Sequence, residues 1–405
     1  MGKINRLKKC RFCNSRLLKK NLTMKNMPFT DEFLHKRDLG KEFLDDIEIY
    51  TCSKCSLVQT LKNINVSKYY LDYQYSVGQS ATANNFMKKL ARNINKKYFS
   101  NKKNKKIFEI GSSDGCQLNE FKKLKFGVTG CEPSKSLSEL AAKRKIKTIN
   151  SMFTSDTINI LEKKKFDVIL LSYTFDHLQN PKDFLKNIKK ILNKDGILVI
   201  EVHDLDKIFK NIEFCLFEHE HSIYLNRRTA KIILALLGFE IINFNIVNQK
   251  DRRANSLLFV AKLSNDRLKD FTKMAPPRPL NFVEFKKDIK NGISNLDRFI
   301  ERAKTNGEKV AGYGAGGRGV MTLANMKNSS KLEFLLEKRP KSKNIYTPHS
   351  NIPIHGLNYL KNNKVDKILV FSFGYLKEIK KDLKQFGYKS NQITSFVDVM
   401  KGSYV

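Results

Sequence analysis

Residues 106–115 read Lys-Ile-Phe-Glu-Ile-Gly-Ser-Ser-Asp-Gly, an apolar strand that runs into a glycine-containing turn. Further apolar runs alternate with amphipathic stretches as far as Leu263. Such alternation predicts an α/β fold with a parallel, doubly wound sheet. Sheets of this kind bind ligands at the carboxyl ends of their strands, where this turn lies. We expect strands at Lys106–Ile110, Val128–Glu132, Asp167–Ser172, Ile197–Val202, Glu240–Val247 and Leu257–Lys262, with helices at Leu118–Leu124 and Lys182–Leu192.

Two acidic residues near this turn select among nucleotide ligands. Glu109 stands two positions before Gly111, and the turn lacks the full spacing of a dinucleotide fingerprint. A carboxylate there suits a cationic ammonium group rather than a pyrophosphate. The next strand ends at Glu132, whose carboxylate can accept two hydrogen bonds from a ribose diol.

This turn, the acid after the second strand and the later run Asp167-Val-Ile169, in this order, resemble class I S-adenosylmethionine-dependent methyltransferases. The resemblance implies S-adenosylmethionine as the cofactor, in a pocket at the edge of the sheet. A glycine turn in an unrelated α/β fold is the alternative. The cofactor contacts that the resemblance implies are Glu109, Gly111, Ser112, Asp114, Gly115 and Glu132.

Four of the seven cysteines form two C-x2-C pairs, Cys10 with Cys13 and Cys52 with Cys55. Each pair lets two thiolates of one turn hold the same ion, and two pairs complete the tetrahedral sulfur shell that zinc prefers. Because four sulfur ligands leave no position for a substrate, this zinc would fold the domain rather than catalyse. Redox-active pairs, or the coincidence of one pair, are the alternatives. We expect the other three cysteines to be small buried side chains: Cys116, Cys131 and Cys215.

The composition bounds the remaining possibilities. With 405 residues, of which 41% are hydrophobic, the chain can form two or three ordinary domains. It has no apolar run of membrane-spanning length and no apolar segment after its basic start, so we expect a cytoplasmic protein with no signal peptide and no membrane partner. The formal net charge of +36 would attract nucleic acid, acidic membranes or phosphorylated small molecules. Because the excess is scattered lysine rather than clustered arginine and aromatics, we favour compositional drift over a nucleic-acid surface.

A second nucleotide-type fold is expected in the tail. The Pro-rich stretch Met274–Pro279 is typical of a linker, and a helix over Asn281–Ala303 follows it. Strands are then expected at Lys309–Gly312, Leu332–Leu336 and Lys367–Phe371. The pattern predicts a zinc-binding domain at 1–75, a methyltransferase domain at 76–270 and a C-terminal Rossmann-like domain at 280–405.

The order of cysteine-rich head, methyltransferase middle and glycine-loop tail resembles the sugar C-methyltransferases that act on nucleotide-linked 4-keto-deoxy sugars. In the tail, the resemblance rests on Gly312-Tyr-Gly-Ala315, on Thr347-Pro-His-Ser-Asn-Ile-Pro-Ile354 and on Phe371–Ile379. The family's Tyr-x-Tyr segment is matched by Tyr73-Gln-Tyr75, which implies Tyr75 as a further cofactor contact. The family's His-Gly-Gly-Ser-type turn is replaced here by residues 249–256.

The resemblance also implies a catalytic group. The family's Tyr-x-Glu-His string falls on Glu218-His219-Glu220-His221, where Glu218 replaces the tyrosine, and its histidine after the fourth strand falls on His177. His221 would be the base that removes an acidic C–H, because imidazole titrates near neutrality. Glu220 would orient His221 or the sugar, and His177 would donate a hydrogen bond to the developing oxyanion. Glu218 could do so only if burial kept it protonated.

Two other interpretations of this string stay open. In an extended conformation His219 and His221 share one face, as in a polar edge strand. The two histidines and a carboxylate could also bind a second metal. His203 lies just past a strand end and could touch the acceptor, whereas three histidines are expected in ordinary loops: His35, His349 and His355.

The glycines of the tail form the pattern Gly312-x-Gly314-x-x-Gly317 between strand and helix, with Glu337 after the next strand. Taken alone, this spacing indicates NAD. The family resemblance implies instead a degenerate nucleotide fold that closes over the acceptor, with Gly314, Gly317 and Arg318 near its diphosphate. A purely structural glycine turn is the other possibility.

We therefore expect an enzyme that transfers the S-adenosylmethionine methyl group to a carbon of a nucleotide-linked keto-deoxy sugar by base-assisted enolate formation, in carbohydrate biosynthesis. Methyl transfer to oxygen or nitrogen of another small acceptor is the alternative within the same class. The positive charge raises a second alternative, a zinc-headed RNA-binding methyltransferase. A dehydrogenase would follow if the tail bound NAD and the middle bound nothing.

Overall fold

The computed structural model describes residues 4–30, 32–71, 73, 76, 78, 80–161, 164–264 and 280–403. The chain forms two compact units, each assembled from segments that are separate in sequence. Both cysteine pairs belong to the same unit as the expected methyltransferase domain, whereas residues 20–49 and 205–220 belong to the unit of the tail. The two units combine segments of different expected domains, and the three domain boundaries stay a prediction. The first unit comprises residues 1–19, 50–204 and 221–278, and the second comprises residues 20–49, 205–220 and 279–405.

The first unit is built on a seven-stranded sheet with the order β13-β14-β11-β10-β7-β8-β9. The five strands from β11 to β9 are parallel, which confirms the predicted α/β class. The other edge differs from the prediction, because β14 is antiparallel to both β11 and β13. Its connection from β13, residues 244–256, holds only a short 3-10 turn, and a direct return of this kind gives antiparallel pairing. The strands are β7 (Lys106–Ile110), β8 (Gly127–Cys131), β9 (Lys147–Ile149), β10 (Phe166–Ser172), β11 (Leu192–Val202), β13 (Phe239–Asn243) and β14 (Leu257–Leu263).

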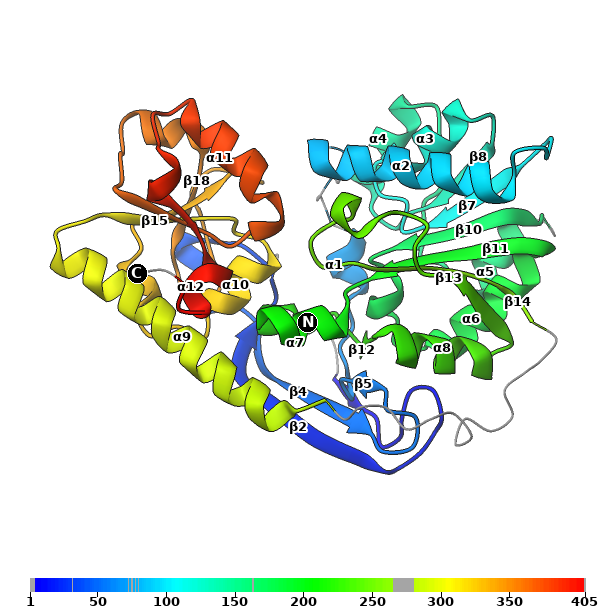
Figure 1. Ribbon diagram of the computed structural model, residues 1–405, viewed down its shortest axis with the longest axis horizontal. Helices are drawn as coiled ribbons and strands as arrows, with labels where there is room; N and C mark the ends of the chain where they lie inside the picture. Colours follow the sequence, from blue (N-terminus) through cyan, green and yellow to red (C-terminus); the bar gives the residue numbers. More distant parts are fainter. Residues whose placement is uncertain are drawn as a thin grey trace. The chain divides into compact units, whose positions relative to one another are not determined.

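Helices cover both faces of this sheet (Figure 1). Alternate residues of each central strand point to opposite faces, so Ile107 of β7 packs with one set of helices and Phe108 with the other. One set contains α2 (Ala81–Tyr98), α3 (Cys116–Lys123) and α4 (Lys135–Lys143), and the other contains α5 (Ser155–Ile160), α6 (Pro181–Ile191) and α8 (Arg227–Leu236). Burial on both faces explains why the central strands are recognisable as apolar runs in the sequence.

Local signals fix the ends of these helices. α6 begins after Asn180, whose side chain accepts the backbone N–H of Asp183, and Pro181 occupies the first helical position. α3 begins directly after its N-cap, Gly115, which has φ +74° and at which a Cβ would lie 3.1 Å from Ala141. A residue with a side chain at position 115 would therefore be both strained and crowded. The glycine that ends the turn consequently precedes the first residue of the helix.

Short strands tie the first residues of the chain into the same unit. β1 (Asn5–Arg6) pairs with β6 (Lys62–Asn63), and β5 (Val58–Gln59) pairs with the end of β4 (Leu44–Cys52). On its other side β5 pairs with β12 (Ile223–Tyr224). Because β12 directly follows the Glu218–His221 string, this pairing holds the end of the string in place.

The second unit contains the second Rossmann-like sheet, with the order β20-β19-β15-β16-β18-β17-β3. The strands from β20 to β18 are parallel, and β17 and β3 are antiparallel additions at one edge. Helix α9 (Phe282–Thr305) confirms the helix expected at Asn281–Ala303. His35 and His355, expected in loops, lie in strands β3 and β18. The strands are β3 (Leu34–His35), β15 (Val310–Tyr313), β16 (Leu335–Glu337), β17 (Ile345–Tyr346), β18 (Pro353–Gly356), β19 (Lys367–Val370) and β20 (Ile393–Ser395).

The remaining elements of the second unit pack around this sheet or precede it in the chain. α12 (Phe396–Met400) packs against α9, and α10 (Gly317–Leu323) packs against the 3-10 turn η4 (Phe214–Leu216). The other elements are β2 (Leu18–Pro28), most of β4, α7 (Leu205–Asn211) and α11 (Leu376–Lys384). Among the described residues, none of the helices has the length and apolar character needed to cross a membrane.

Candidate active site

The turn after β7 is held in a tight conformation at the carboxyl edge of the first sheet. Gly111 has φ +70°, and a Cβ there would lie 2.5 Å from Oγ1 of Thr174. The N–H groups of Gly111 and Ser112 both donate to the carbonyl of Cys131, at 2.8 and 3.1 Å. Only glycine meets both the backbone conformation and the close approach at position 111. The predicted glycine-containing turn is therefore present, and the contact of Gly111 with the cofactor stays a prediction.

Glu109 lies at the end of β7 and is 3% exposed. Its Oε2 atom is buried and has no hydrogen-bond partner among the described residues. Burial raises the pKa of this carboxyl well above its usual value, and the charge of Asp114 raises it further, while Arg253 opposes the shift. A buried carboxylate oxygen that lacks a partner is costly unless a ligand satisfies it. This oxygen fits the ammonium group of S-adenosylmethionine.

Glu132, the acid after β8, is buried in a different way. Its Oε2 accepts the N–H of Ser113 and its Oε1 accepts the N–H of Ser134, both at 2.9 Å. Burial raises the pKa of this carboxyl, and the two backbone hydrogen bonds oppose that rise. Each carboxylate oxygen keeps further acceptor capacity, so a fixed Glu132 can still receive the hydroxyls of a ribose.

The expected cofactor contacts Ser112 and Asp114 occupy the same turn. Ser112 is 3% exposed, and its Oγ has no hydrogen-bond partner within the described part of the chain. The side chain of Asp114 is instead engaged by Ser76 at 2.5 Å, by the N–H of Cys116 at 3.2 Å and by Arg144 at 3.5 Å. Asp114 therefore holds the turn together, and any cofactor contact from it would be additional. Tyr75 lies outside the described residues.

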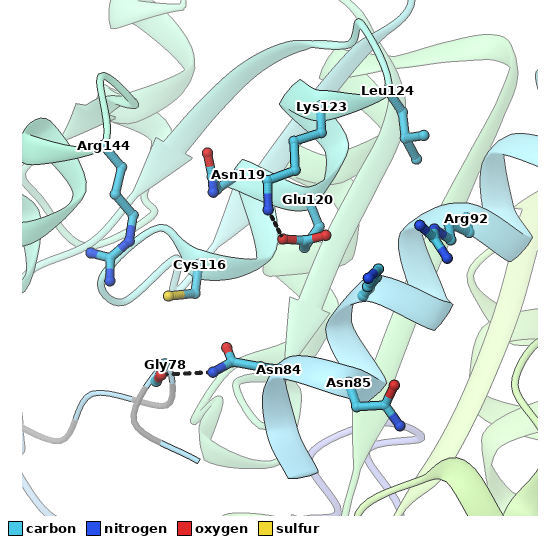
Figure 2. Close-up of a pocket in the computed structure, with 11 residues that line it drawn as sticks. Gly78, Asn84, Asn85, Arg92, Cys116, Asn119, Glu120, Lys123, Leu124 and Arg144 are labelled. Carbon is cyan, nitrogen blue, oxygen red and sulfur yellow. Dashed lines mark hydrogen bonds and ion pairs between the residues drawn. The ribbon is translucent and has the colours of Figure 1, made fainter. Parts of the chain in front are cut away.

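An open groove of 830 Å³ lies beside this turn, along α2 and α3 (Figure 2). Its charged lining is mainly basic, and its one carboxylate, Glu120, is paired with Lys123 at 2.5 Å. A basic groove repels a sulfonium and an ammonium. The acidic edge with Glu109 and Glu132 suits S-adenosylmethionine better. The basic residues that line the groove are Lys88, Arg92, Lys123 and Arg144.

A buried ion pair, which the sequence analysis missed, supports the same edge. Glu201 in β11 has no exposed surface, and Arg253 binds both of its carboxylate oxygens. Ser256 donates to Glu201 at 2.7 Å, and the guanidinium of Arg253 lies 4.5 Å from the ring centre of Tyr173. Arg253 falls in the segment 249–256 that replaces the family turn. An acid near the end of a buried strand, such as Glu201, needs a cation as its partner. This requirement could have indicated an ion pair from the sequence.

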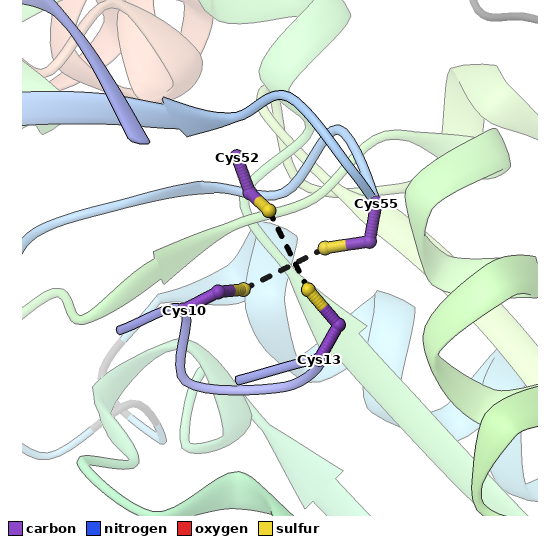
Figure 3. A group of neighbouring side chains, drawn as sticks. All are labelled: Cys10, Cys13, Cys52 and Cys55. Carbon is purple, nitrogen blue, oxygen red and sulfur yellow. Dashed lines mark hydrogen bonds between the residues drawn. The ribbon is translucent and has the colours of Figure 1, made fainter. Parts of the chain in front are cut away.

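The four cysteines of the two pairs come together as predicted (Figure 3). The sulfur atoms of Cys10 and Cys55 are 3.6 Å apart, and those of Cys13 and Cys52 are 3.5 Å apart. A tetrahedral zinc with Zn–S bonds of about 2.3 Å separates its sulfurs by about 3.8 Å. The arrangement therefore fits a zinc ion enclosed by four thiolates. The remaining cysteines carry no disulfide, and both Cys131 and Cys215 are buried as expected, whereas Cys116 is only half-buried.

The two pairs reach this geometry through matching turns. After the first pair, the N–H of Asn14 donates to the carbonyl of Cys10 at 3.1 Å, and after the second, Ser56 donates to Cys52 at 2.8 Å. Asn14 and Ser56 both have positive φ, 57° and 61°. Gln59 adds a hydrogen bond to the sulfur of Cys10 at 3.3 Å. Such outer contacts orient thiolate ligands for a metal.

A cluster of three histidines and one aspartate follows the ends of β10 and β11. His221 is 3% exposed, and its ring centre lies 4.7 Å from that of His177 and 5.0 Å from that of His203. Asp176 is 3% exposed and accepts a hydrogen bond from Nδ1 of His203 at 2.9 Å. His177 and His221 were expected from the sequence, His203 was left open and Asp176 was missed. His203 directly follows β11 and Asp176 lies four residues after β10. Both strands end at the same sheet edge, and this was the signal that could have identified Asp176.

His177 is distinguished by its partners and its protonation state. Its Nδ1 lies 2.6 Å from the hydroxyl of Tyr70, and its Nε2 lies 3.7 Å from Asp176. Burial lowers the pKa of His177 to about 3, because the charges of His221 and His203 add to the cost of protonation and Asp176 only partly offsets it. His177 is therefore a neutral imidazole at physiological pH.

The two glutamates of the string belong to the second unit. Glu218 is 5% exposed, and one of its oxygens lies 2.4 Å from the position of a Cβ on Gly317. Nε2 of His219 donates to the carbonyl of Met27 at 2.8 Å, and its ring packs against two phenylalanines. The neighbours of His219 thus differ from those of His221, and the suggested edge strand is not formed, since β12 starts only at Ile223. Glu220 is half-buried.

The tail glycine loop is closed by carboxylates of the chain itself. Ala315 donates its N–H to Glu337 at 2.6 Å, and Arg318 pairs with the buried Glu213 at 3.3 Å. Glu218 packs against Gly317, and Gly314 has φ +101° with a Cβ position only 2.3 Å from Ser372. An anion at Gly314, Gly317 and Arg318 would have to displace these acids. The substrate contact expected there stays a prediction, and the geometry favours the structural alternative.

Taken with this geometry, comparisons with known families identify the class. Family models match a zinc binding domain at residues 10–70, a methyltransferase domain at residues 83–243 and a C-methyltransferase C-terminal domain at residues 266–397. The fold, the acidic sheet edge and these matches make the chain an S-adenosylmethionine-dependent methyltransferase with a structural zinc ion.

The particular family follows from the whole length of the chain. C-methyltransferase NovU of Streptomyces niveus is 22% identical over 363 residues, which cover 86% of this chain and 85% of NovU. With the three domain matches in the same order, the chain is similar along most of its length to S-adenosylmethionine-dependent C-methyltransferases. The Ubiquinone biosynthesis O-methyltransferase of Pelagibacter ubique is 31% identical over 125 residues, 30% of this chain and 50% of that protein.

Solved structures similar to the chain include the plantazolicin methyltransferase BpumL in complex with S-adenosylhomocysteine (SAH). It has a TM-score of 0.37 and 17% identity, and the match covers 49% of this chain and 89% of that one. A second is an S-adenosylmethionine-dependent methyltransferase from Clostridium acetobutylicum, with a TM-score of 0.35, 13% identity and coverage of 44% and 92%.

Proposed function

We propose that the protein methylates a carbon of a nucleotide-linked keto-deoxy sugar, with His221 as the base that forms the enolate. The observation that carries this proposal is the buried imidazole of His221 beside a neutral His177, in a chain matched along 86% of its length to a C-methyltransferase. Carbon is a poor nucleophile without deprotonation, so a C-methyltransferase needs a base at the acceptor.

On the donor side, we assign the binding of S-adenosylmethionine to the edge of the first sheet. Glu109 would hold its ammonium group, and Glu132, fixed by two backbone N–H groups, would hold its ribose. The glycine turn would let the backbone approach the ligand, with Ser112 adding a hydroxyl that has no hydrogen-bond partner among the residues described. When bound, S-adenosylmethionine supplies an electrophilic methyl group on a sulfonium.

On the acceptor side, His221 and His177 would have different roles because their protonation behaviour differs. His221 would take the α-proton of the ketone, leaving the electron pair as an enolate whose carbon attacks the methyl group. His177 would have one N–H to donate, since its pKa of about 3 keeps it neutral. It cannot be the base that works near neutrality, because an imidazole whose conjugate acid has so low a pKa is a very weak proton acceptor. Glu220, the chain neighbour of His221, would orient it or the sugar.

The test combines calorimetry with turnover. Purified protein should bind SAH, and a panel of nucleotide-linked 4-keto-deoxy sugars offered with S-adenosylmethionine should yield a product with a new C–CH₃ bond. His221→Ala should abolish turnover and leave the SAH dissociation constant within about two-fold, whereas the exposed His35→Ala should change neither. Methylation of an oxygen or nitrogen instead, or wild-type turnover by His221→Ala, would remove the proposed reaction.

A further inference from the structure

A buried aspartate and a histidine form a hydrogen-bonded pair beside His221. The reaction proposed above assigns no role to this pair. Asp176 lies in the 3-10 turn η3 (Phe175–His177), and His203 directly follows β11. Oδ2 of Asp176 is 2.9 Å from Nδ1 of His203 and 3.4 Å from its backbone N–H. The backbone N–H of Ser222 donates to the carbonyl of Asp176 at 2.8 Å. The pair is thus fixed both to the end of the sheet and to the segment that carries His221.

The negative charge of Asp176 favours a positively charged imidazole among the histidines of the cluster. Burial raises the pKa of Asp176, but the hydrogen bond from His203 and the charges of three nearby histidines outweigh burial, so the net pKa lies below its usual range. Asp176 therefore stays ionised although its side chain is only 4% exposed. A buried carboxylate of this kind needs a cation beside it. His177 is neutral, and His203 is the hydrogen-bond partner of the charge.

The neighbours of His203 include two rings and, on the far side of one of them, a cation that already has a partner. Its ring packs on Tyr173 at 4.6 Å and on His221 at 5.0 Å. The guanidinium of Arg253, on Tyr173, is already neutralised by Glu201. Several titratable and charged groups surround the Asp176–His203 pair. Two of them are His177, which contacts Tyr70, and His221, whose neighbours are Glu220 and Tyr224. The others include Tyr173 with Arg253 and Glu201, and Asp204, the next residue in the chain.

We propose that His203, held by Asp176, is the imidazolium that binds the enolate oxygen of the acceptor while His221 removes the proton. Asp176 is then a positioning residue, because it acts through His203. The proposal rests on the proposed function for its substrate, a ketone. The charge on His203 is part of the proposal itself, and it can be tested on the free protein without any substrate.

The geometry allows both groups to serve one small ketone. A hydrogen-bond donor acts about 2.7–3.1 Å from an oxyanion, and reacting atoms approach to about 3–3.5 Å. Ring nitrogens of His203 and His221 and an oxygen of Asp176 lie within 4.8 Å of one another. Adjacent atoms of a ketone, its α-carbon and its oxygen, can therefore meet one imidazole each.

The same segment also contacts the donor turn. Thr174, two residues before Asp176, has its hydroxyl 3.3 Å from the carbonyl of Ile110 and leaves room only for a glycine at position 111. Residues 172–177 thus touch the expected methyl-donor turn on one side and carry Asp176 on the other. In the step proposed, the α C–H bond breaks, its proton goes to His221, and the new C–C bond forms as the S–CH₃ bond breaks. His203 keeps its proton throughout and stabilises the negative oxygen.

The first experiment needs no substrate. Long-range ¹H–¹⁵N spectra of the full-length protein labelled in histidine should show one doubly protonated imidazole at pH 7.5 that is lost in His203→Gln. Asp176→Asn should lower the pKa of that histidine by at least one unit, and His35→Gln should remove a different resonance. A His203 that is neutral at pH 7, or one that titrates unchanged in Asp176→Asn, would overturn the proposal.

The second experiment uses whichever nucleotide-linked keto sugar supports turnover. His203→Ala should lower kcat about 10²–10³-fold, as for loss of an oxyanion donor, with KM for the acceptor changed less than about three-fold. His203→Gln, which keeps a neutral donor, should fall between that variant and the wild type, and Asp176→Asn should move the alkaline limb of the rate profile to lower pH. Unchanged kcat in His203→Ala with normal melting would refute the role. If no keto sugar is methylated, the proposed function fails, and the spectra still decide whether His203 carries the charge.

Discussion

Replacing Glu109 by glutamine separates the binding of the methyl donor from the stability of the fold. The wild-type carboxyl is buried, and its Oε2 has no partner in the described structure. If it holds the ammonium of the donor, the variant exchanges a charged hydrogen bond for a neutral one. Hydrogen bonds to charged groups contribute about 1.5–3 kcal/mol, so the dissociation constant of SAH should rise about 10- to 150-fold.

Glu109→Gln should stabilise the ligand-free fold although it weakens SAH binding. Burial and the charge of Asp114 raise the pKa of Glu109 in the folded protein above its unfolded value. The folded state therefore binds more protons than the unfolded state between these two pKa values, and stability falls as pH rises through that interval. Glutamine resembles the protonated form, so the ligand-free Glu109→Gln protein should melt above the wild type at pH 8, and the difference should shrink on acidification towards pH 5.

Glu132→Gln is the matched control, since it removes a buried acid at the same edge. Both oxygens of Glu132 accept backbone N–H groups, and a carboxamide can satisfy only one of them. That variant should lose about 1–3 kcal/mol of stability as well as donor affinity. Glu109→Gln should lose affinity alone.

The assay is calorimetry with SAH and with 5′-methylthioadenosine, which lacks the amino-acid group, together with melting curves at pH 5 and pH 8. Glu109→Gln should weaken SAH and leave 5′-methylthioadenosine unchanged, whereas Glu132→Gln should weaken both. Equal affinity of wild type and Glu109→Gln for SAH would refute the assignment of Glu109 to the ammonium.

Three further changes test other parts of the site. Cys55→Ser should lower the zinc content measured by mass spectrometry and destabilise the first unit by several kcal/mol, since structural zinc contributes folding free energy; full zinc occupancy in that variant would contradict the four-thiolate site. Arg253→Ala should cost about 3–5 kcal/mol in urea unfolding because it leaves Glu201 buried without its cation, and a loss below about 1 kcal/mol would show that water replaces the guanidinium. Gly111→Ala should abolish SAH binding at a stability cost of about 1–3 kcal/mol, because its Cβ would lie 2.5 Å from Thr174, and a relieving Thr174→Ser/Gly111→Ala double variant should recover less than half of the stability since the strained φ remains.

The central strands could be predicted from the sequence because burial on both faces makes them continuous apolar runs. β7 was predicted with its observed bounds, Lys106–Ile110, and β10 and β14 within one residue at each end. The half-exposed edge strand β9 (Lys147–Ile149) was missed, since a three-residue strand carries no period. The zinc ligands were predictable because the C-x2-C spacing alone places two thiolates of one turn on the same ion.

The division of the chain into units could not be predicted in the same way. Residues 20–49 leave the zinc segment and join the unit of the tail, where β3 pairs with β17, a partner some three hundred residues away in sequence. Local patterns contain no information on such a partner. The hydrogen bond between Asp176 and His203 could not be predicted for the same reason. Neither residue belongs to a motif, and only the parallel pairing of β10 and β11 brings them together.

Three acids at one sheet edge show why a strand-end carboxylate cannot be assigned from sequence alone. Glu109, Glu132 and Glu201 are all buried and all stand at or near the end of a strand. Glu201 is neutralised by Arg253 and Ser256, Glu132 is held by two backbone N–H groups, and Glu109 keeps an oxygen with no partner in the described structure. A carboxylate that is already neutralised has little to gain from a cationic ligand, whereas one that is buried and incomplete gains most. We therefore expect Glu109, rather than Glu132 or Glu201, to bind the ammonium group of the donor. Arg253, which neutralises Glu201, comes from the segment in which the family motif is absent.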